Sequence, residues 1–291
     1  MKKLHFFIII IFIISFAGCS SKENTNSVRV ITNAYSEQNI KPLETSDSSD
    51  VGSINITSPL GSNNFCELKN QKLTISYDNG QNTVSVPFPF YDLEHISGIY
   101  ISKEKTAIAY GSSSETYIMV SDDMGKSWNT YILKNNNWVD HKYIGFTSDK
   151  NGWLVLNGSI GAGMQQHYVY QTDDGGKTWY EIPDKDVYHA VLTGAGFSTT
   201  DIGFITYRYS DFTADICWTK DRGKNWTMLD VKLPTKYKDY CKTPLSPQFL
   251  NTEGRIEIQL YKDASYTGSI YIVTNDYGLT WKYDESLDNI K

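Results

Sequence analysis

The sequence predicts an all-β fold, a β-propeller of five four-stranded blades, from two observations. One turn-forming frame recurs at intervals of about 50 residues, and the runs between its copies are short, apolar and bounded by Gly, Asn, Asp and Pro. After residue 19, no stretch places its apolar residues at a sustained helical period. Four short strands within a repeat of this length form a propeller blade.

The recurring frame is S/T-x-D-x-G-x-S/T/N-W, as in TDDGGKTW at residues 172–179. Its aligned aspartates lie 45, 51, 47 and 55 residues apart: Asp78, Asp123, Asp174, Asp221 and Asp276. The first copy is degenerate, because it has Thr83 where the others have tryptophan. Five copies predict five blades that begin at about residue 52, and an irregular sixth blade from residues 28–50 stays open as an alternative.

The strands of a blade can be placed in the clearest repeat. Its apolar or alternating runs end in turn residues and occupy residues 143–149, 152–158, 168–172 and 178–183. The next repeat has the same pattern at residues 195–207, 216–219 and 225–230. The frame itself falls between the third and fourth runs of each repeat.

Each part of the frame has a structural explanation. Glycine tolerates a tight turn, the aspartate accepts hydrogen bonds from turn amides, and the leading Ser or Thr does so more weakly. Tryptophan supplies a large apolar surface for packing against a neighbouring blade. A calcium site is the alternative, but the loop is shorter than an EF-hand and lacks its terminal glutamate. We therefore predict structural roles for Asp78, Asp123, Gly125, Trp128, Asp174, Gly176, Trp179, Asp221, Gly223, Trp226, Asp276, Gly278 and Trp281.

The first residues have the pattern of an export signal. Lys2 and Lys3 precede an apolar run over residues 4–16, which is too short for a confident membrane-spanning helix. The run ends in FAGC, and this sequence resembles the lipobox of bacterial lipoproteins. The resemblance implies a signal peptide over residues 1–18 and lipidation of Cys19. We expect a lipid-anchored protein on the extracytoplasmic side of a bacterial cell membrane.

Residues 19–50 are rich in Ser, Asn, Thr, Asp and Glu, which predicts a flexible tether before a propeller over residues 51–291. The run VRVITNAY at residues 28–35 is the exception and could add a strand. The formal charge is −6, and it becomes −8 once Lys2 and Lys3 are removed with the leader. An acidic chain argues against a nucleic-acid partner, and the lipid rather than surface charge would hold it at a membrane.

Three cysteines remain if Cys19 carries lipid. Because Cys66, Cys217 and Cys241 are odd in number, at most one disulfide can form among them, and the sequence does not choose the pair. Export permits a disulfide without requiring one.

The repeated frame resembles the Asp-box, or BNR repeat, of sialidases, sortilin-type receptors, some glucan hydrolases and photosystem II assembly factors. Its combination with F-x-x-x-x-x-G-W is most similar to the last group. The resemblance covers about residues 70–285 and implies a propeller whose boxes lie at the outer edge of the blades, away from the ligand face. It implies little about activity, because one fold hosts many functions.

The face opposite the boxes is then formed by inter-blade links and by the loops between second and third strands. These segments are rich in aromatic residues and contain every histidine of the mature chain. The candidate ligand-face residues are Tyr91, His95, Trp138, His141, His167, Tyr188, His189 and Tyr240. Because aromatic residues are common interface anchors, they favour a protein or glycan partner, although blade packing would explain many of them equally well.

A metal site is one hypothesis for this face. His95, His141 and His189 recur at steps of 46 and 48 residues, so three imidazoles could converge near the axis, with Asp92 or Asp140 adding oxygen. The simpler interpretation is that repeats copy residues and that these histidines are packed or exposed. We therefore predict neither a metal nor another cofactor.

Catalysis is weakly supported. A sialidase would need an arginine triad, and the chain has only four arginines, of which Arg222 lies in a box and Arg29 in the predicted tether. A glucan hydrolase would need paired carboxylates, and the loops offer Asp211, Asp215 and Asp263 without fixing a pair. The sequence favours a surface binding or assembly module, with a carbohydrate-binding or glycan-hydrolysing protein as the alternative.

Overall fold

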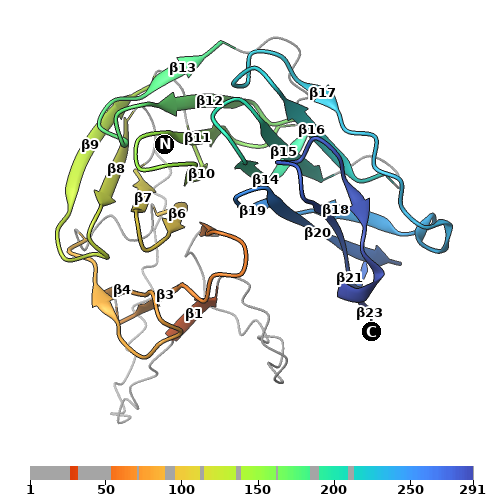
Figure 1. Cartoon of the computed structure of the whole chain (residues 1–291), viewed down its shortest axis with the longest axis horizontal. Coiled ribbons are helices and arrows are strands. Elements are labelled where there is room, and N and C mark those ends of the chain that lie inside the picture. The colour runs from red at the N-terminus through yellow and green to blue at the C-terminus, as the bar shows by residue number, and fades with distance from the viewer. Residues whose placement is uncertain are drawn as a thin grey trace, which may run out of the picture.

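Among the residues that it describes, the computed structural model is all-β apart from two short 3-10 helices (Figure 1). It describes residues 27–31, 54–70, 72–88, 96–111, 115–135, 139–161, 163–183, 190–208 and 213–290. Within these ranges no helix has the length and hydrophobicity needed to span a bilayer.

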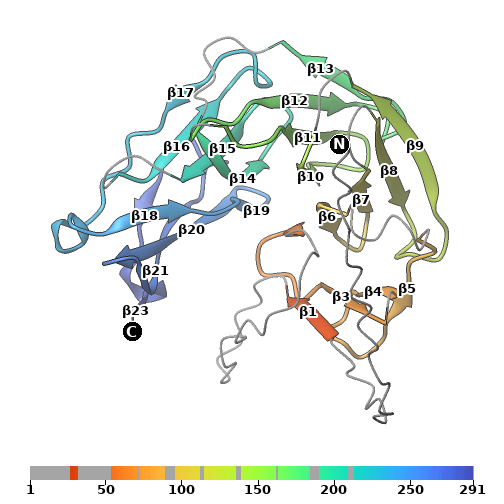
Figure 2. The ribbon, with the colours of Figure 1, turned by 180° about the vertical axis from the view of Figure 1, so that it is seen from behind.

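Five antiparallel sheets follow one another in chain order around a common centre (Figures 1 and 2). Blade 1 contains β1 (Ser27–Ile31), β3 (Phe65–Lys69), β4 (Lys72–Ser76) and β5 (Val84–Ser85). Blade 2 contains β6 (Gly98–Ile101), β7 (Thr106–Tyr110), β8 (Glu115–Ser121) and β9 (Asn129–Lys134), with β2 (Asn55–Thr57) added in parallel to β6. Blade 3 contains β10 (His141–Phe146), β11 (Gly152–Asn157), β12 (His167–Thr172) and β13 (Tyr180–Ile182).

The last two blades complete the array. Blade 4 contains β14 (Val191–Phe197), β15 (Gly203–Arg208), β16 (Asp215–Thr219) and β17 (Thr227–Met228). Blade 5 contains β18 (Cys241–Pro244), β20 (Glu253–Lys262), β21 (Ser265–Thr274) and β22 (Lys282–Tyr283), with β19 (Gln248–Leu250) on β20 and β23 (Asn289–Ile290) on β21. The short helices are η2 (Thr235–Tyr237) and η3 (Glu285–Leu287).

The predicted propeller of five blades is confirmed. The strand expected within residues 28–35 is β1, which pairs with β3 and joins blade 1, so the described residues form no sixth sheet. The signal peptide, Cys19 and the rest of the predicted tether lie outside the described residues. Cys66, Cys217 and Cys241 are free thiols, and the first two are buried.

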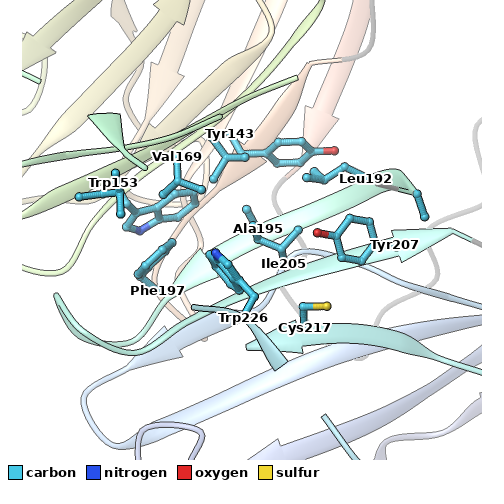
Figure 3. Close-up of a cluster of buried hydrophobic side chains, with 13 residues drawn as sticks. Tyr143, Trp153, Val169, Leu192, Ala195, Phe197, Ile205, Tyr207, Cys217 and Trp226 are labelled. Atoms are coloured by element: carbon cyan, nitrogen blue, oxygen red, sulfur yellow. The ribbon is translucent and has the colours of Figure 1, made fainter. Parts of the chain in front are cut away.

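Consecutive blades are joined by apolar clusters. Figure 3 shows the cluster between blades 3 and 4, where Trp153, Phe197 and Trp226 pack together. Three similar clusters join blades 1 and 2, 2 and 3, and 4 and 5. Because both faces of a middle blade are covered in this way, β11 is buried at all six positions. Hydrophobic burial between sheets is therefore the main force that holds the array together.

Blade 5 ends the array differently. On β20, Ile256, Ile258 and Leu260 belong to the cluster shared with blade 4. The alternating positions on the other face carry Arg255, Glu257 and Gln259, which are partly buried. Among the described residues no apolar cluster joins blade 5 to blade 1, so this boundary lacks the packing that joins the other blades.

Residues 55–60, which we call the axial segment, run along the inner strands of the propeller. β2 pairs with β6, and its side chains reach blade 3, where Asn55 Nδ2 donates to Lys142 O at 3.1 Å and Thr57 Oγ1 donates to Ile144 O. A few residues later, the backbone N–H of Leu60 donates to the carbonyl of Phe249 in blade 5 at 3.1 Å. One short segment thus connects the inner strands of three blades.

Candidate functional site

Each Asp-box supplies the hydrogen-bond donors for its own aspartate. In blade 3, Asp174 Oδ1 accepts from the N–H of Thr178 at 2.9 Å, and Asp174 Oδ2 accepts from the Thr178 hydroxyl at 2.6 Å. The Thr172 hydroxyl donates to Asp174 Oδ1 at 2.8 Å and accepts from the N–H of Gly176 at 3.0 Å. The degenerate copy in blade 1 repeats this pattern with Asp78. The aspartate oxygens are therefore occupied by donors of their own loop.

The glycine and tryptophan of the box lock the loop onto the blades. Gly176 has φ +91°, and an added Cβ would lie 3.3 Å from Val120 of the preceding blade. Trp179 Nε1 donates to Gly176 O at 3.0 Å, and its ring meets Phe146 edge-on at 6.1 Å between centroids. Equivalent Trp–Phe contacts occur in blades 4 and 5. The tryptophan therefore covers an aromatic residue that closes the first strand of its own blade.

These hydrogen bonds change the acidity of the box aspartates. Donation from the side chain and backbone of Ser127 lowers the pKa of Asp123 to about 2. Desolvation alone would raise the pKa of Asp174, but donors from Thr178, Thr172 and Lys177 together lower it to about 2. The pKa values of the other three box aspartates are lowered as well. Bonds to the charged form explain this direction.

The boxes share one face of the propeller with the turns between first and second strands. The N–H of Gly175 donates to Lys150 O at 2.8 Å, and the N–H of Tyr277 donates to Thr252 O at 2.9 Å. We call this side the box face. The loops between second and third strands and the links between blades lie at the opposite end of the strands, which we call the opposite face.

Three of the candidate ligand-face residues can be placed. His141 begins β10 and is partly buried, and this burial lowers its pKa. His167 begins β12, is 3% exposed, and has Nε2 at 3.2 Å from the Tyr207 hydroxyl. Tyr240 packs edge-on against Tyr237. The remaining candidates lie outside the described residues: Tyr91, His95, Trp138, Tyr188 and His189.

The three-histidine hypothesis therefore remains untested, since only His141 of that set is described. Within the described part of the chain, no group of three or more His, Cys, Asp or Glu side chains is placed to hold a metal ion. Of the proposed catalytic carboxylates, Asp211 lies outside the described residues and Asp263 occupies an exposed turn. Asp215 is buried at 3% exposure.

Three described lysines are buried and were missed by the sequence analysis; Lys142 and Lys242 lie on the opposite face. Each of these two is the second residue of the innermost strand of its blade: Lys142 in β10 is 1% exposed and Lys242 in β18 is 7% exposed. Lys142 Nζ donates to Ser97 Oγ at 3.2 Å, and Lys242 Nζ donates to Tyr240 O at 2.9 Å. Burial lowers the pKa of Lys142 to about 8 and lowers that of Lys242.

A cleft of about 690 Å³ opens between blades 4 and 5 on the opposite face. Segments 210–215 and 236–248, both predicted to form this face, contribute to its lining. Asp215 accepts from the Thr213 hydroxyl at 2.6 Å, and Lys242 lines the same cleft. Met228 is 51% exposed and lies among further apolar lining residues, namely Leu229, Val231, Leu233 and Tyr237. The cleft thus combines apolar surface with buried charged groups.

Comparison with known proteins supports the fold. A family model described as Sortilin, neurotensin receptor 3 (Sortilin-Vps10) matches residues 71–208, slightly less than half of the chain. Comparison with curated proteins gives no significant match. Together with the five boxes, the match makes this chain a BNR-type β-propeller related to that group.

The solved structures that resemble this chain are distant from it in sequence. An ancestral GH74 enzyme is 17% identical with a TM-score of 0.50, over 81% of this chain and 33% of the enzyme, so this chain spans about a third of its length. YCF48 from Cyanidioschyzon merolae is 13% identical with a TM-score of 0.47, over 78% of this chain and 70% of YCF48. NanB sialidase from Streptococcus pneumoniae is 17% identical with a TM-score of 0.42, over 67% and 33%. The GH74 likeness concerns the fold and not the activity.

Proposed function

We propose that this protein is an extracytoplasmic binding module that recognises a partner protein through the opposite face. The observation that carries the proposal is the cleft between blades 4 and 5, with Met228 exposed and with Asp215 and Lys242 buried. Burying charged groups costs free energy. Burial lowers the pKa of Lys242, and an ionisable group perturbed in this way inside a cleft is a candidate for a functional site.

The composition of the cleft favours a protein partner. Apolar side chains lie beside exposed polar residues at Asp230, Thr235 and Lys238, which is the arrangement of an interface with an apolar core and a polar rim. Because β2 lies along the inner strands of blades 2 and 3, we expect a partner to engage this face rather than thread the axis.

We further propose that Cys19 anchors the protein to a bacterial membrane through a lipid. The FAGC sequence before the polar segment 20–26 supports this proposal. Metabolic labelling of bacteria with a fatty-acid analogue tests it, with label expected on the full-length chain and lost in Cys19→Ala. Equal labelling of the variant would contradict the proposal.

Affinity capture tests the partner-binding proposal. We expect the immobilised full-length protein to retain a defined protein from membrane and cell-wall extracts. Met228→Asp should reduce capture by about tenfold, because it places a charge in the apolar surface. Ile132→Asp is the matched control, since Ile132 is also exposed on an outermost strand but lies in blade 2, outside the cleft. Equal capture by the two variants would contradict the proposal.

A further inference from the structure

A second recess lies at the other end of the propeller axis, on the box face. Its volume is about 680 Å³, within the range of roughly 300–1,000 Å³ that ligand sites occupy. Thr57, Ser58 and Pro59 of the axial segment contribute to it, and the first-to-second turns of blades 2 to 5 surround it. The axial segment therefore forms part of the wall of this recess.

Hydroxyl groups in equivalent turns supply hydrogen-bond donors to the recess. Ser148 Oγ accepts from the N–H groups of Lys150 and Asn151 at 3.3 and 2.9 Å. In blade 4, Thr199 Oγ1 accepts from two backbone N–H groups at 3.2 and 2.9 Å. Each oxygen is occupied by its own turn, so the hydroxyl proton remains to be donated to a ligand acceptor. The two side chains follow Phe146 and Phe197 at the same interval.

Carboxylates supply the acceptors, and the charge balance disfavours an anionic ligand. Glu104 and Asp149 line the recess and are exposed. Lys105 is the one cation among the described lining residues, and it is 4% exposed, bonded to Asp122 and positioned over the Phe146 ring. With that charge compensated, an anion would meet two carboxylates and no free cation. A neutral ligand with hydroxyl groups would avoid this repulsion.

Apolar surface occupies the blade 5 side of the recess. Tyr277 is 39% exposed and Leu250 is 48% exposed. Tyr277 is held in place because its carbonyl accepts from the Ser198 hydroxyl at 2.6 Å. Trp153 and Phe197 stack at 5.5 Å between centroids in the wall of the same recess. Aromatic and aliphatic side chains of blades 3, 4 and 5 therefore contribute to the recess wall.

We propose that this recess binds a neutral oligosaccharide. A sugar ring presents apolar C–H groups to an aromatic surface, and its hydroxyls both donate and accept hydrogen bonds. Tyr277 and Leu250 provide the apolar surface, while the turn hydroxyls and the two carboxylates provide complementary donors and acceptors. The site lies on the face away from the proposed protein-binding cleft and is independent of it.

Calorimetric titration of the full-length protein tests the proposal, with cellotriose, chitotriose and maltotriose as neutral probes and 3′-sialyllactose as the anionic comparison. We expect saturable binding of at least one neutral trisaccharide and weaker binding of sialyllactose. Tyr277→Asn should weaken binding by about tenfold, because it removes the ring from a backbone position with φ +63° that asparagine tolerates. Met124→Asn is the matched control, since Met124 holds the same box position in blade 2 with φ +55° and does not line the recess.

Three results would overturn the proposal: no saturable binding of any neutral probe at millimolar concentration, equal losses in Tyr277→Asn and Met124→Asn, or a preference for sialyllactose. Asp149→Asn gives a second check, because it should lower affinity while keeping a side chain of the same size. Met228→Asp should leave sugar binding unchanged, so failure of this proposal and failure of the protein-binding proposal are distinguishable.

Discussion

The box face and the opposite face of the propeller accommodate their ionisable side chains in different ways. At the box face, one hydrogen-bond pattern repeats in all five blades and satisfies every box aspartate locally. At the opposite face, blades 3 and 5 bury lysines near the start of their inner strands, and blade 4 buries Asp215. The box face repeats one pattern, whereas at the opposite face burial lowers the pKa of both lysines.

This difference separates fold from function. Residues that recur in every blade serve the common fold, so we expect the box aspartates to contribute to stability. Residues that depart from the repeat are not needed by the common fold, and costly departures are where a site is expected. The same reasoning applies at the box face, where Tyr277 occupies a variable position of its box and lines the recess.

The largest expected effect tests the packing at the box face. A Cβ on Gly203 would lie 2.3 Å from the Phe197 ring, so Gly203→Ala should lower the free energy of unfolding by about 3 kcal/mol. Gly161→Ala is the control, because nothing lies within 4 Å of its added Cβ. Urea titration measures both, and similar small losses would show that the Phe–Gly packing is not needed.

The next effect tests the free-energy cost of burying a lysine at the opposite face. Lys142→Met should raise the free energy of unfolding by about 2 kcal/mol at pH 7, because it removes a buried ammonium group. The pKa of Lys142 is lowered from 10.5 to about 8, so the unfolded chain binds more protons between these values and stability should rise with pH there. Denaturation at pH 7.5 and 9.5 checks both points, and a destabilised variant would indicate that Lys142 supports the fold.

A smaller effect tests the box itself. Asp174→Ala should lower the free energy of unfolding by about 1 kcal/mol, comparable with loss of a helix cap, because it leaves loop donors without their acceptor. Asp173→Ala removes the neighbouring exposed carboxylate and serves as the control. If the two variants melt alike, the box hydrogen bonds contribute nothing measurable.

The smallest expected effect is on the stability of the protein at acid pH. Because the pKa values of Asp123 and Asp174 are lowered from 3.8 to about 2, their stabilisation is present above pH 3.8 and is lost as the pH falls towards 2. Replacing both with asparagine should flatten the loss of stability between pH 4 and pH 2. If the variant loses the same stability between pH 4 and pH 2, other carboxylates cause the acid unfolding.

The repeat explains why the blades were predictable and the cleft was not. The box frame and the alternating strands depend on neighbours a few residues away, as in the bonds of Thr172 and Thr178 to Asp174. The axial strand depends on Asn55 reaching Lys142, 87 residues later, and a three-residue strand gives no sequence signal for that contact. The lysines could have been found by comparing equivalent strand starts, where a charge follows His141 and Cys241.

We propose that the Asp-boxes stabilise the propeller and that the opposite face binds the partner. The most direct test measures melting temperature and partner capture for Asp174→Ala and Met228→Asp side by side. We predict that Asp174→Ala melts at a lower temperature and still captures the partner, whereas Met228→Asp keeps its melting temperature and loses capture. Loss of capture in Asp174→Ala with unchanged melting would contradict the account.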